Sequence, residues 1–344
     1  MHGIVIRNTG SSYIVRMDDG TQCECKVKGN FRIKGIRTTN PVAVGDGVTV
    51  SVSTETKKAE EFAWITAIDD RRNYIIRKAS NLSKQSHILA ANIDLALLIV
   101  TIARPETNTT FIDRFLASAE AYRVPVVIVF NKTDDLSADE RQMMDYLTIV
   151  YREVGYDVHH ISALKGEGVD ALRAVLAGKT TLLAGNSGVG KSTLINLLIP
   201  GAKARTSEIS EAHGTGMHTT TFSQMYSTPP APRAGGADAP DIEEPSTDEV
   251  TASPARGIEG VSLIDIPGIK GFGTFDMEPE EVGHYFREIF EIGRDCRFSN
   301  CTHTHEPGCA VLDALEGHRI APSRYASYLS MLDDKDESKY REAH

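Results

Sequence analysis

At positions 185–192 this chain of 344 residues reads Gly-Asn-Ser-Gly-Val-Gly-Lys-Ser, and the expected architecture follows from that segment. It matches the phosphate-loop pattern G-x-x-x-x-G-K-[ST] between an expected strand at 180–184 and an expected helix at 193–199. The glycines let backbone N–H groups turn toward phosphate oxygens, and the helix N-terminus adds positive potential. We expect Lys191 to reach the β- and γ-phosphates of a nucleotide and the Ser192 hydroxyl to ligate Mg²⁺.

A second motif, Asn131-Lys132-Thr133-Asp134, follows an apolar strand expected at 124–130. It lies at a carboxyl strand end, where open α/β sheets bind ligands. The Asp134 carboxylate can accept two hydrogen bonds from the ring N–H and the exocyclic amine of guanine, whereas adenine presents an acceptor at the matching ring position. A site built in this way rejects the wrong base by roughly 10⁴-fold or more. The triplet Ser162-Ala163-Leu164 resembles the loop whose backbone N–H contacts the guanine carbonyl in GTPases.

The segment Asp265-Ile266-Pro267-Gly268 is expected at the γ-phosphate. It ends a strand expected at 261–264, so Asp265 is placed to hold Mg²⁺ through water and the Gly268 N–H to face the γ-phosphate. Many GTPases have a glutamine at the next position to orient the attacking water, whereas this chain has Ile269. Because a hydrocarbon cannot position water, we expect slow intrinsic hydrolysis.

A run of polar side chains, His218-Thr219-Thr220-Thr221, precedes that segment. Either Thr220 or Thr221 would complete the Mg²⁺ shell with Ser192 and Asp265, and the sequence leaves both open. His218 is the candidate helper for hydrolysis, so the catalytic candidates are His218, Asp265 and Ile269. The residues expected to contact GTP are Asn131, Lys132, Thr133, Asp134, Ser162, Ala163, Gly185, Asn186, Ser187, Gly188, Val189, Gly190, Lys191, Ser192, Thr193 and Gly268.

The five cysteines fall into two groups. Cys23 and Cys25 alternate within a strand-like run and are expected to be packed side chains. The other group, Cys296-x₄-Cys301-x-His303-x₅-Cys309, supplies three thiolates and one imidazole within 14 residues. Soft sulfur ligands and an imidazole in tetrahedral number favour one closed, structural Zn²⁺ site. His305 is a rival to His303 as the fourth ligand.

Length and composition indicate a soluble chain of two or three domains. No run reaches the roughly 18 to 20 apolar residues of a membrane helix, and residues 1–4 do not begin a signal peptide, so a cytoplasmic location without membrane contact is expected. The net charge is −10, but residues 1–80 carry 13 Lys+Arg and 9 Asp+Glu, which is +4 and leaves −14 for the remainder. A basic first part is compatible with binding to a nucleic-acid backbone, and equally with an ordinary solvated surface. Two interpretations are open for one set of basic side chains: contacts to phosphates, or ordinary surface charges. The set is Arg71, Arg72, Arg77 and Lys78.

The texture of the sequence changes along the chain. Residues 3–72 read as about five short strands with turns, which predicts a small barrel of the OB type. From residue 90 onward, buried strands alternate with helices, beginning with the apolar run 93–101, as in a doubly wound, mostly parallel sheet. The helices expected in this part are 110–122, 137–154 and 168–177.

The last third is different again. Residues 229–257 are rich in Pro, Gly and acidic side chains and are expected to be a disordered insertion. After residue 276 the chain is expected to be helical and to contain the Cys/His cluster. An apolar helix face is predicted for Val282, Phe286, Ile289 and Phe290.

The order of the motifs is informative, because the base-reading box precedes the phosphate loop. This order resembles that of the circularly permuted GTPases. With a small barrel before these motifs and a Cys/His cluster after them, the chain closely resembles the RsgA (YjeQ) family of GTPases of small ribosomal subunit biogenesis. The resemblance favours His303 over His305 as the zinc ligand and includes a hydrophobic residue at Ile269. The insertion 229–257 and the extra His305 depart from the family pattern.

The resemblance implies an OB-fold barrel at 1–72, a circularly permuted P-loop GTPase domain at 73–275 and a helical zinc-binding domain at 276–344. It also implies partners, namely GTP or GDP and the small ribosomal subunit with its rRNA, and a GTPase activity that the subunit stimulates during late maturation. A monomer is expected. Only residues 270–275 separate the Asp-x-Pro-Gly loop from the third domain, so a movement at the γ-phosphate would pass directly into it. The competing interpretations are a P-loop ATPase or kinase, which Asp134 argues against, and an RNA-binding protein that uses nucleotide only structurally.

Overall fold

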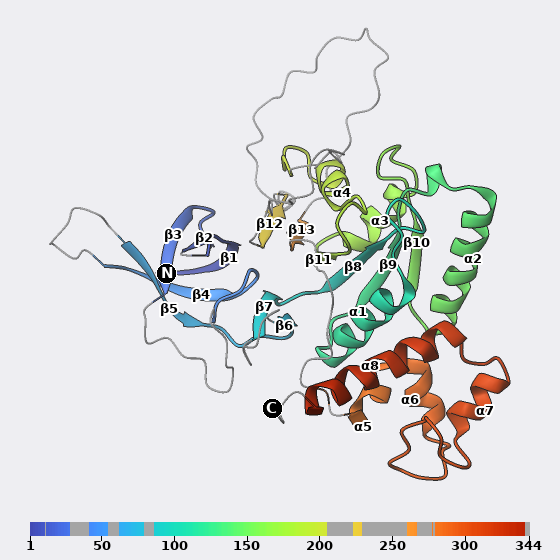
Figure 1. Ribbon diagram of the computed structural model, residues 1–344. Helices are drawn as coiled ribbons and strands as arrows, with labels where there is room; N and C mark the ends of the chain where they lie inside the picture. Colours follow the sequence, from blue (N-terminus) through green and yellow to red (C-terminus); the bar gives the residue numbers. More distant parts are fainter. Residues whose placement is uncertain are drawn as a thin grey trace, which may run out of the picture.

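The computed structural model describes residues 1–10, 12–27, 41–53, 62–78, 86–204, 223–228, 260–266, 277 and 279–340. Figure 1 shows an N-terminal barrel, a central α/β part and a C-terminal group of helices. The insertion expected at 229–257 and the connection at 270–275 lie outside the described residues. Within the described part of the chain, no helix is long and apolar enough to cross a membrane.

The N-terminal part is a closed five-stranded barrel. Its strands pair in the order β1-β2-β3-β5-β4, and β4 pairs back with β1. Alternate side chains such as Val5, Val15 and Ile65 fill the core, as the two-residue period of a strand requires, and Cys25 is buried among them. The predicted OB-type barrel is confirmed. Its strands are β1 (His2–Asn8), β2 (Tyr13–Met17), β3 (Gln22–Val27), β4 (Gly47–Ser53) and β5 (Phe62–Ile68).

A hairpin that the sequence did not predict connects the barrel to the central part. It consists of β6 (Tyr74–Lys78) and β7 (Ser86–Ala91), which form a sheet of two strands. Two arginines precede it. Arg71 donates to both carboxylate oxygens of Asp46, each at 2.7 Å, and its side chain is only 8% exposed.

The interpretation of Arg71 as a phosphate contact is therefore wrong, because its guanidinium compensates the charge of a buried carboxylate. Arg72 pairs with Asp94 at 2.8 Å and stays 63% exposed. The side chains of Arg77 and Lys78 lie outside the described residues.

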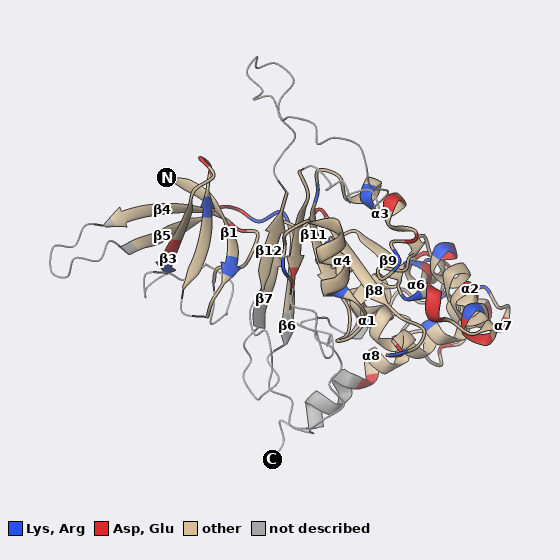
Figure 2. Ribbon diagram, turned by 90° about the horizontal axis from the view of Figure 1, so that it is seen from above, with Lys and Arg blue, Asp and Glu red and all other residues tan. Residues whose placement is uncertain are grey.

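The central part is a doubly wound, mostly parallel sheet, as predicted. Strands β10, β9, β8, β11 and β13 lie in that order and run parallel, and β12 joins β13 antiparallel. Helices α1 and α2 pack on one face and α3 and α4 on the other, so β8 is buried along its whole length. Figure 2 shows no Lys, Arg, Asp or Glu on β8 and β9. The strands are β8 (Leu95–Val100), β9 (Val126–Phe130), β10 (Asp157–His160), β11 (Thr180–Ala184), β12 (Gln224–Ser227) and β13 (Ser262–Asp265), and the helices are α1 (Thr109–Ala121), α2 (Ala138–Glu153), α3 (Val169–Leu176) and α4 (Lys191–Leu198), with a 3-10 turn at Thr133–Asp135.

The carboxyl ends of the parallel strands meet at one edge of this sheet, and the loops that follow them carry the sequence motifs. Strand β12 is the strand of the central part that lies farthest from β10, and it pairs with the barrel strand β1. Arg7 of β1 pairs with Gln224, and the Asn8 N–H donates to the Ser223 carbonyl at 3.2 Å. The barrel and the central part therefore share one 11-stranded sheet.

The C-terminal part is helical and lies against α1 through its last helix, α8 (Figure 1). The single apolar face predicted at 282–290 is only partly correct. The helix ends at Val282, and a 3-10 turn at Gly283–Tyr285 follows, where the glycine backbone lies close to the His303 ring. Helix α6 buries the side on which Ile289 lies, and Phe290, about 100° further around the helix, is 41% exposed, whereas the other three predicted residues are buried. The helices are α5 (Pro279–Val282), α6 (Arg287–Gly293), α7 (Ala310–Glu316) and α8 (Pro322–Tyr340).

Candidate functional site

The phosphate loop connects β11 to α4 and is shaped by glycines with positive φ. Gly185, Gly188 and Gly190 have φ angles of 144°, 83° and 100°. A Cβ on Gly185 would lie 2.2 Å from the Ile99 carbonyl oxygen, and a Cβ on Gly190 would lie 2.3 Å from Nδ2 of Asn131. Both positions therefore require glycine, because a side chain would collide with β8 or with the base-reading loop. The turn brings the phosphate loop directly against that second loop.

Lys191 and Asp265 are the charged residues at this turn. Lys191 Nζ donates to the carbonyls of Gly185 and Asn186 at 2.7 and 2.8 Å. Asp265 ends β13, which neighbours β11, and its Oδ1 is buried without a partner among the described residues. Burial raises the pKa of Asp265 to about 6, and the nearby Lys191 opposes that rise. A buried carboxylate oxygen that lacks a protein partner fits a site that a hydrated cation completes.

Asn131 fixes three loops relative to one another. Its amide Nδ2 donates to the Val189 carbonyl at 2.7 Å, and its Oδ1 accepts from the Ala163 N–H at 2.9 Å. Asn131 is buried, so these bonds are shielded from water. Thr133, two residues after Asn131 in the same loop, donates from Oγ1 to the Ile161 carbonyl at 3.1 Å. The base-reading loop, the Ser-Ala-Leu loop and the phosphate loop thus form one unit.

Asp134 and Lys132 lie at the base-reading end of this unit. The Asp134 side chain is 11% exposed, and a hydrogen bond from the Ser162 side chain lowers the pKa of Asp134. Lys165 Nζ lies 3.9 Å from Oδ2 of the same carboxylate. Asp134 therefore stays ionised at neutral pH and remains an acceptor for two N–H groups.

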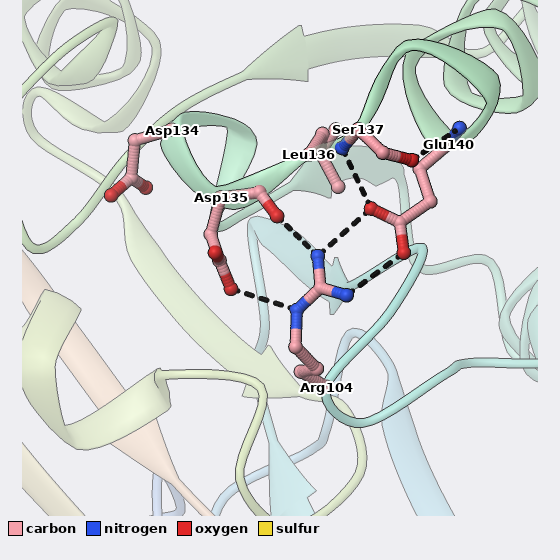
Figure 3. A pocket seen from close by; sticks show the side chains of 6 residues that line it. All are labelled: Arg104, Asp134, Asp135, Leu136, Ser137 and Glu140. Atoms are coloured by element: carbon pink, nitrogen blue, oxygen red, sulfur yellow. Dashed lines mark hydrogen bonds and ion pairs between the residues drawn. The ribbon is translucent and has the colours of Figure 1, made fainter.

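A loop to which the sequence analysis gave no role lies beside the same unit. Residues 101–108 follow β8, and the Arg104 backbone carbonyl accepts a hydrogen bond from Lys132 Nζ at 2.5 Å. Arg104 lines a pocket of about 490 Å³, and Figure 3 shows its side chain there. The pocket is lined by Arg104, Asp134, Asp135, Leu136, Ser137 and Glu140. The rule that ligands bind beyond carboxyl strand ends predicts a role for this loop, since it follows the most buried strand.

Several predicted site residues cannot be placed. His218, Thr220 and Thr221 lie outside the described residues, and so do Gly268 and Ile269. Their assignments at the γ-phosphate, at Mg²⁺ and in hydrolysis stay predictions. Of the segment at the end of β13, only Asp265 and Ile266 are described.

The three cysteines of the C-terminal part gather around His303. The ligand atoms of Cys296, Cys301, His303 and Cys309 all lie within 4.8 Å of one another, so this cluster can hold a metal ion. Nδ1 of His303 lies 3.5 Å from the sulfurs of Cys296 and Cys309, which are 3.9 Å apart. His305, the rival ligand, is exposed, and its Nδ1 lies 2.8 Å from Thr304 Oγ1.

Hydrogen bonds outside the cluster hold its loop in place. Glu306 accepts from the backbone N–H groups of Thr302, Thr304 and His305 at 2.6, 3.0 and 3.1 Å. The Tyr325 hydroxyl of α8 donates to the His303 carbonyl at 2.7 Å. These contacts fix the loop that presents the imidazole, as the outer partners of metal ligands commonly do.

Known proteins share both the sequence and the fold. The family model described as RsgA GTPase matches residues 68–248, and the model of the RsgA N-terminal domain matches residues 2–59. The protein "Small ribosomal subunit biogenesis GTPase RsgA" of Bacteroides fragilis is 57% identical over 344 residues, which covers 100% of both chains.

Two solved structures have similar folds. The crystal structure of YjeQ from Thermotoga maritima has a TM-score of 0.67 and 29% identity and covers 97% of each chain. The structure of YloQ, described as a circularly permuted GTPase, has a TM-score of 0.64 and 25% identity over 98% of this chain and 95% of its own. The permuted order of motifs, the barrel, the Cys/His cluster and these full-length similarities lead to one conclusion: the chain belongs to the RsgA family of circularly permuted GTPases.

Proposed function

We propose that this protein hydrolyses GTP while bound to the small ribosomal subunit and acts in the late maturation of that subunit, which stimulates the hydrolysis. The observation that carries the proposal is the unit built around Asn131, in which the base-reading loop and the phosphate loop are fixed side by side. Relatives that are named small ribosomal subunit biogenesis GTPases match the whole chain and support the ribosomal part.

Each part of the nucleotide has a corresponding group in this unit. Asp134, kept ionised by Ser162, would accept two hydrogen bonds from guanine, while the Ala163 region would face the guanine carbonyl. The backbone of Gly185–Thr193 and the ammonium of Lys191 would bind the phosphates. When bound, Mg²⁺ would neutralise phosphate charge, and Ser192 and the unpaired oxygen of Asp265 would hold it.

Zinc is the ion we propose for the Cys/His cluster. With Zn–S bonds of about 2.3 Å and a Zn–N bond of about 2.0 Å, a tetrahedron places its sulfurs about 3.8 Å apart and a sulfur about 3.5 Å from the nitrogen. The cluster has 3.9 Å and 3.5 Å at these two edges. Four protein ligands leave no open position, which supports a structural site.

The domain boundaries expected from the sequence, 1–72, 73–275 and 276–344, are part of the same proposal, as are a monomeric state and a cytoplasmic location. The order of the strands supports the first boundary, because the barrel closes at Ile68. The hairpin of β6 and β7 then belongs with the GTPase domain, since Ile75 and Ala90 of the hairpin are part of the same core cluster as residues of β8 and α1.

The test is GTP hydrolysis by the purified protein with and without small ribosomal subunits. We expect stimulation of more than about tenfold by small subunits, as for GTPases whose partner completes the site. Large subunits serve as the matched control and should not stimulate. Stimulation below about tenfold would contradict the ribosomal role, and ATP that competes as well as GTP would favour a P-loop ATPase or kinase.

A further inference from the structure

The loop between β8 and α1 is closed on itself and lies between the two nucleotide-binding loops. The Thr107 N–H donates to the Thr101 carbonyl at 2.9 Å, and the Thr101 N–H donates to Oγ1 of Thr107 at 3.2 Å. On one side, a Cβ on Gly188 of the phosphate loop would lie 3.5 Å from Cδ of Pro105. This rigid loop therefore holds Arg104 at a defined place beside the phosphate loop.

The Arg104 side chain binds the far end of the base-reading loop. Its Nε donates to Oδ2 of Asp135 at 2.8 Å, and its two terminal nitrogens donate to the two oxygens of Glu140, both at 2.8 Å (Figure 3). Asp135 directly follows the guanine-reading Asp134, and Glu140 forms the capping box of α2 with Ser137. These bonds from Arg104 lower the pKa of Glu140 to about 2.

The backbone of the same residue binds the near end of that loop. The Arg104 carbonyl accepts from Lys132 Nζ at 2.5 Å, and Lys132 itself has a left-handed φ of 65°. Lys132 and Asp135 flank Thr133 and Asp134. Arg104 therefore contacts the base-reading loop on both sides of these two residues. The side chain is 51% exposed, so its ion pairs add little to the overall free energy of unfolding.

From this two-ended contact we infer that Arg104 is a positioning residue, which holds the Lys132–Asp135 loop ready for the guanine base before nucleotide binds. The inference rests on the proposed function. Ordering a loop in advance removes part of the free-energy cost of binding. Because Arg104 acts at the base and not at the γ-phosphate, GTP and GDP benefit equally, and the chemical step is unaffected.

The experiment measures binding and release of a fluorescent GDP and GTP by Arg104→Ala, together with kcat and KM in the presence of small subunits. We expect Kd for both nucleotides to rise by about three- to tenfold through faster dissociation, with kcat at saturating GTP and Tm unchanged. Arg104→Lys should behave like Arg104→Ala, because an ammonium cannot bond both Glu140 oxygens and Asp135 at once. Glu140→Gln keeps a capping side chain but loses the ionic partner, and should raise both Kd values by about two- to fourfold.

The matched control is Arg294→Ala. Arg294 is an exposed arginine that pairs with Glu291 at 2.8 Å in the C-terminal part, and its loss should leave both Kd values unchanged. Unchanged nucleotide release in both Arg104→Ala and Glu140→Gln, or a lower kcat with unchanged Kd, would overturn the inference. Wild-type protein that binds ADP as tightly as GDP would contradict the proposed function itself, and is measured in the same assay.

Discussion

Asp265 ionises in a buried position at the end of β13, where its Oδ1 has no hydrogen-bond partner among the described residues. Lys191 is the nearby cation, but its Nζ donates to carbonyls of the phosphate loop. An ionised carboxylate in such surroundings destabilises the folded state until a cation binds. At this residue, the requirement for ligand binding is therefore opposed to the requirement for stability.

Replacing Asp265 by Asn should stabilise the protein in the absence of nucleotide and Mg²⁺. The pKa of Asp265 in the folded state is about 6, above its ordinary value of 3.8, so the folded state binds more protons between these values and wild-type stability falls as the pH rises through about 6. At pH 7.5 we expect the variant to have a free energy of unfolding about 1 to 3 kcal/mol higher, with the difference vanishing near pH 4. Denaturant unfolding in buffer without Mg²⁺ and nucleotide, at both pH values, measures this. A variant whose free energy of unfolding equals that of the wild type at both pH values would contradict the buried charge. Weaker binding of Mg²⁺ with GTP is expected alongside.

Asp134 should decide which base is bound. Asp134→Asn replaces an acceptor by an amide that also donates, which suits xanthine, since xanthine has a carbonyl where guanine has its amine. We expect GDP to bind at least about 100-fold more weakly and xanthosine diphosphate to bind more tightly than GDP. Competition binding measures both affinities. The control is Asp135→Asn, whose side chain is 64% exposed and turned to Arg104, and which should keep the preference for guanine.

At the scale of elements, the sequence predicted the helices and strands whose formation depends on a local pattern of apolar residues and glycines. The apolar run before residue 101 and the glycines of the phosphate loop are sufficient for the strand–loop–helix order of the central part. The pairing of β6 with β7 was missed, because two short strands give little periodic signal. The break at Gly283–Tyr285 was missed because the apolar spacing continues through it.

The candidate site shows the same division. The motifs and the Cys/His cluster are encoded within short segments. Among the described residues, Asn131 joins the loops of Ala163 and Val189, and the four cluster residues lie together. Arg104 bonds Asp135 and Glu140, which are 31 and 36 positions away in the sequence. No local pattern in the sequence predicts these contacts. The ion pair of Arg71 with Asp46, 25 positions away, was missed for the same reason.

We expect the helices of the C-terminal part to depend on a metal held by the Cys/His cluster as well as on their apolar core. We expect Cys309→Ser, which removes one ligand, to lose the bound metal and the hydrogen-exchange protection of α6 and α7. Affinity for GDP should change by less than about twofold, because other elements build the nucleotide site. Metal analysis and hydrogen exchange measure these effects. Cys23→Ser in the barrel is the control, and an equal loss of metal there, or full protection without metal in Cys309→Ser, would contradict a structural metal.

At the scale of the whole molecule, the three parts are joined in different ways. Among the residues that the structure describes, the pair of Arg7 in β1 with Gln224 in β12 joins the barrel to the central sheet. The C-terminal part is held by Arg324 of α8, which is 1% exposed and bonds Asp113 of α1 at 2.8 Å and Glu288 of α6 at 2.7 and 2.9 Å. The connection at 270–275, which the permuted order suggested as a lever, is therefore not the only attachment of this part. Asp113, which Arg324 bonds, lies in α1, and α1 directly follows the loop of Arg104. The C-terminal part is therefore attached to an element that begins beside the nucleotide site.

Arg324 should therefore be the residue whose loss separates the C-terminal part from the GTPase domain. Arg324→Met leaves Asp113 and Glu288 without their cation, and removing one partner of a buried ion pair costs about 3 to 5 kcal/mol. We expect faster proteolysis between the two parts and a lower Tm, while Arg294→Ala, with its exposed pair to Glu291, should change stability by less than about 1 kcal/mol. Adding Asp113→Asn to Arg324→Met should recover part of the loss, because Tyr151 can still donate to the amide oxygen and the more deeply buried of the two unpaired charges is gone. If the double variant is as unstable as Arg324→Met, the cost does not lie in the pair with Asp113, and lost packing against Phe286, over whose ring the guanidinium lies at 4.8 Å, takes its place in the explanation.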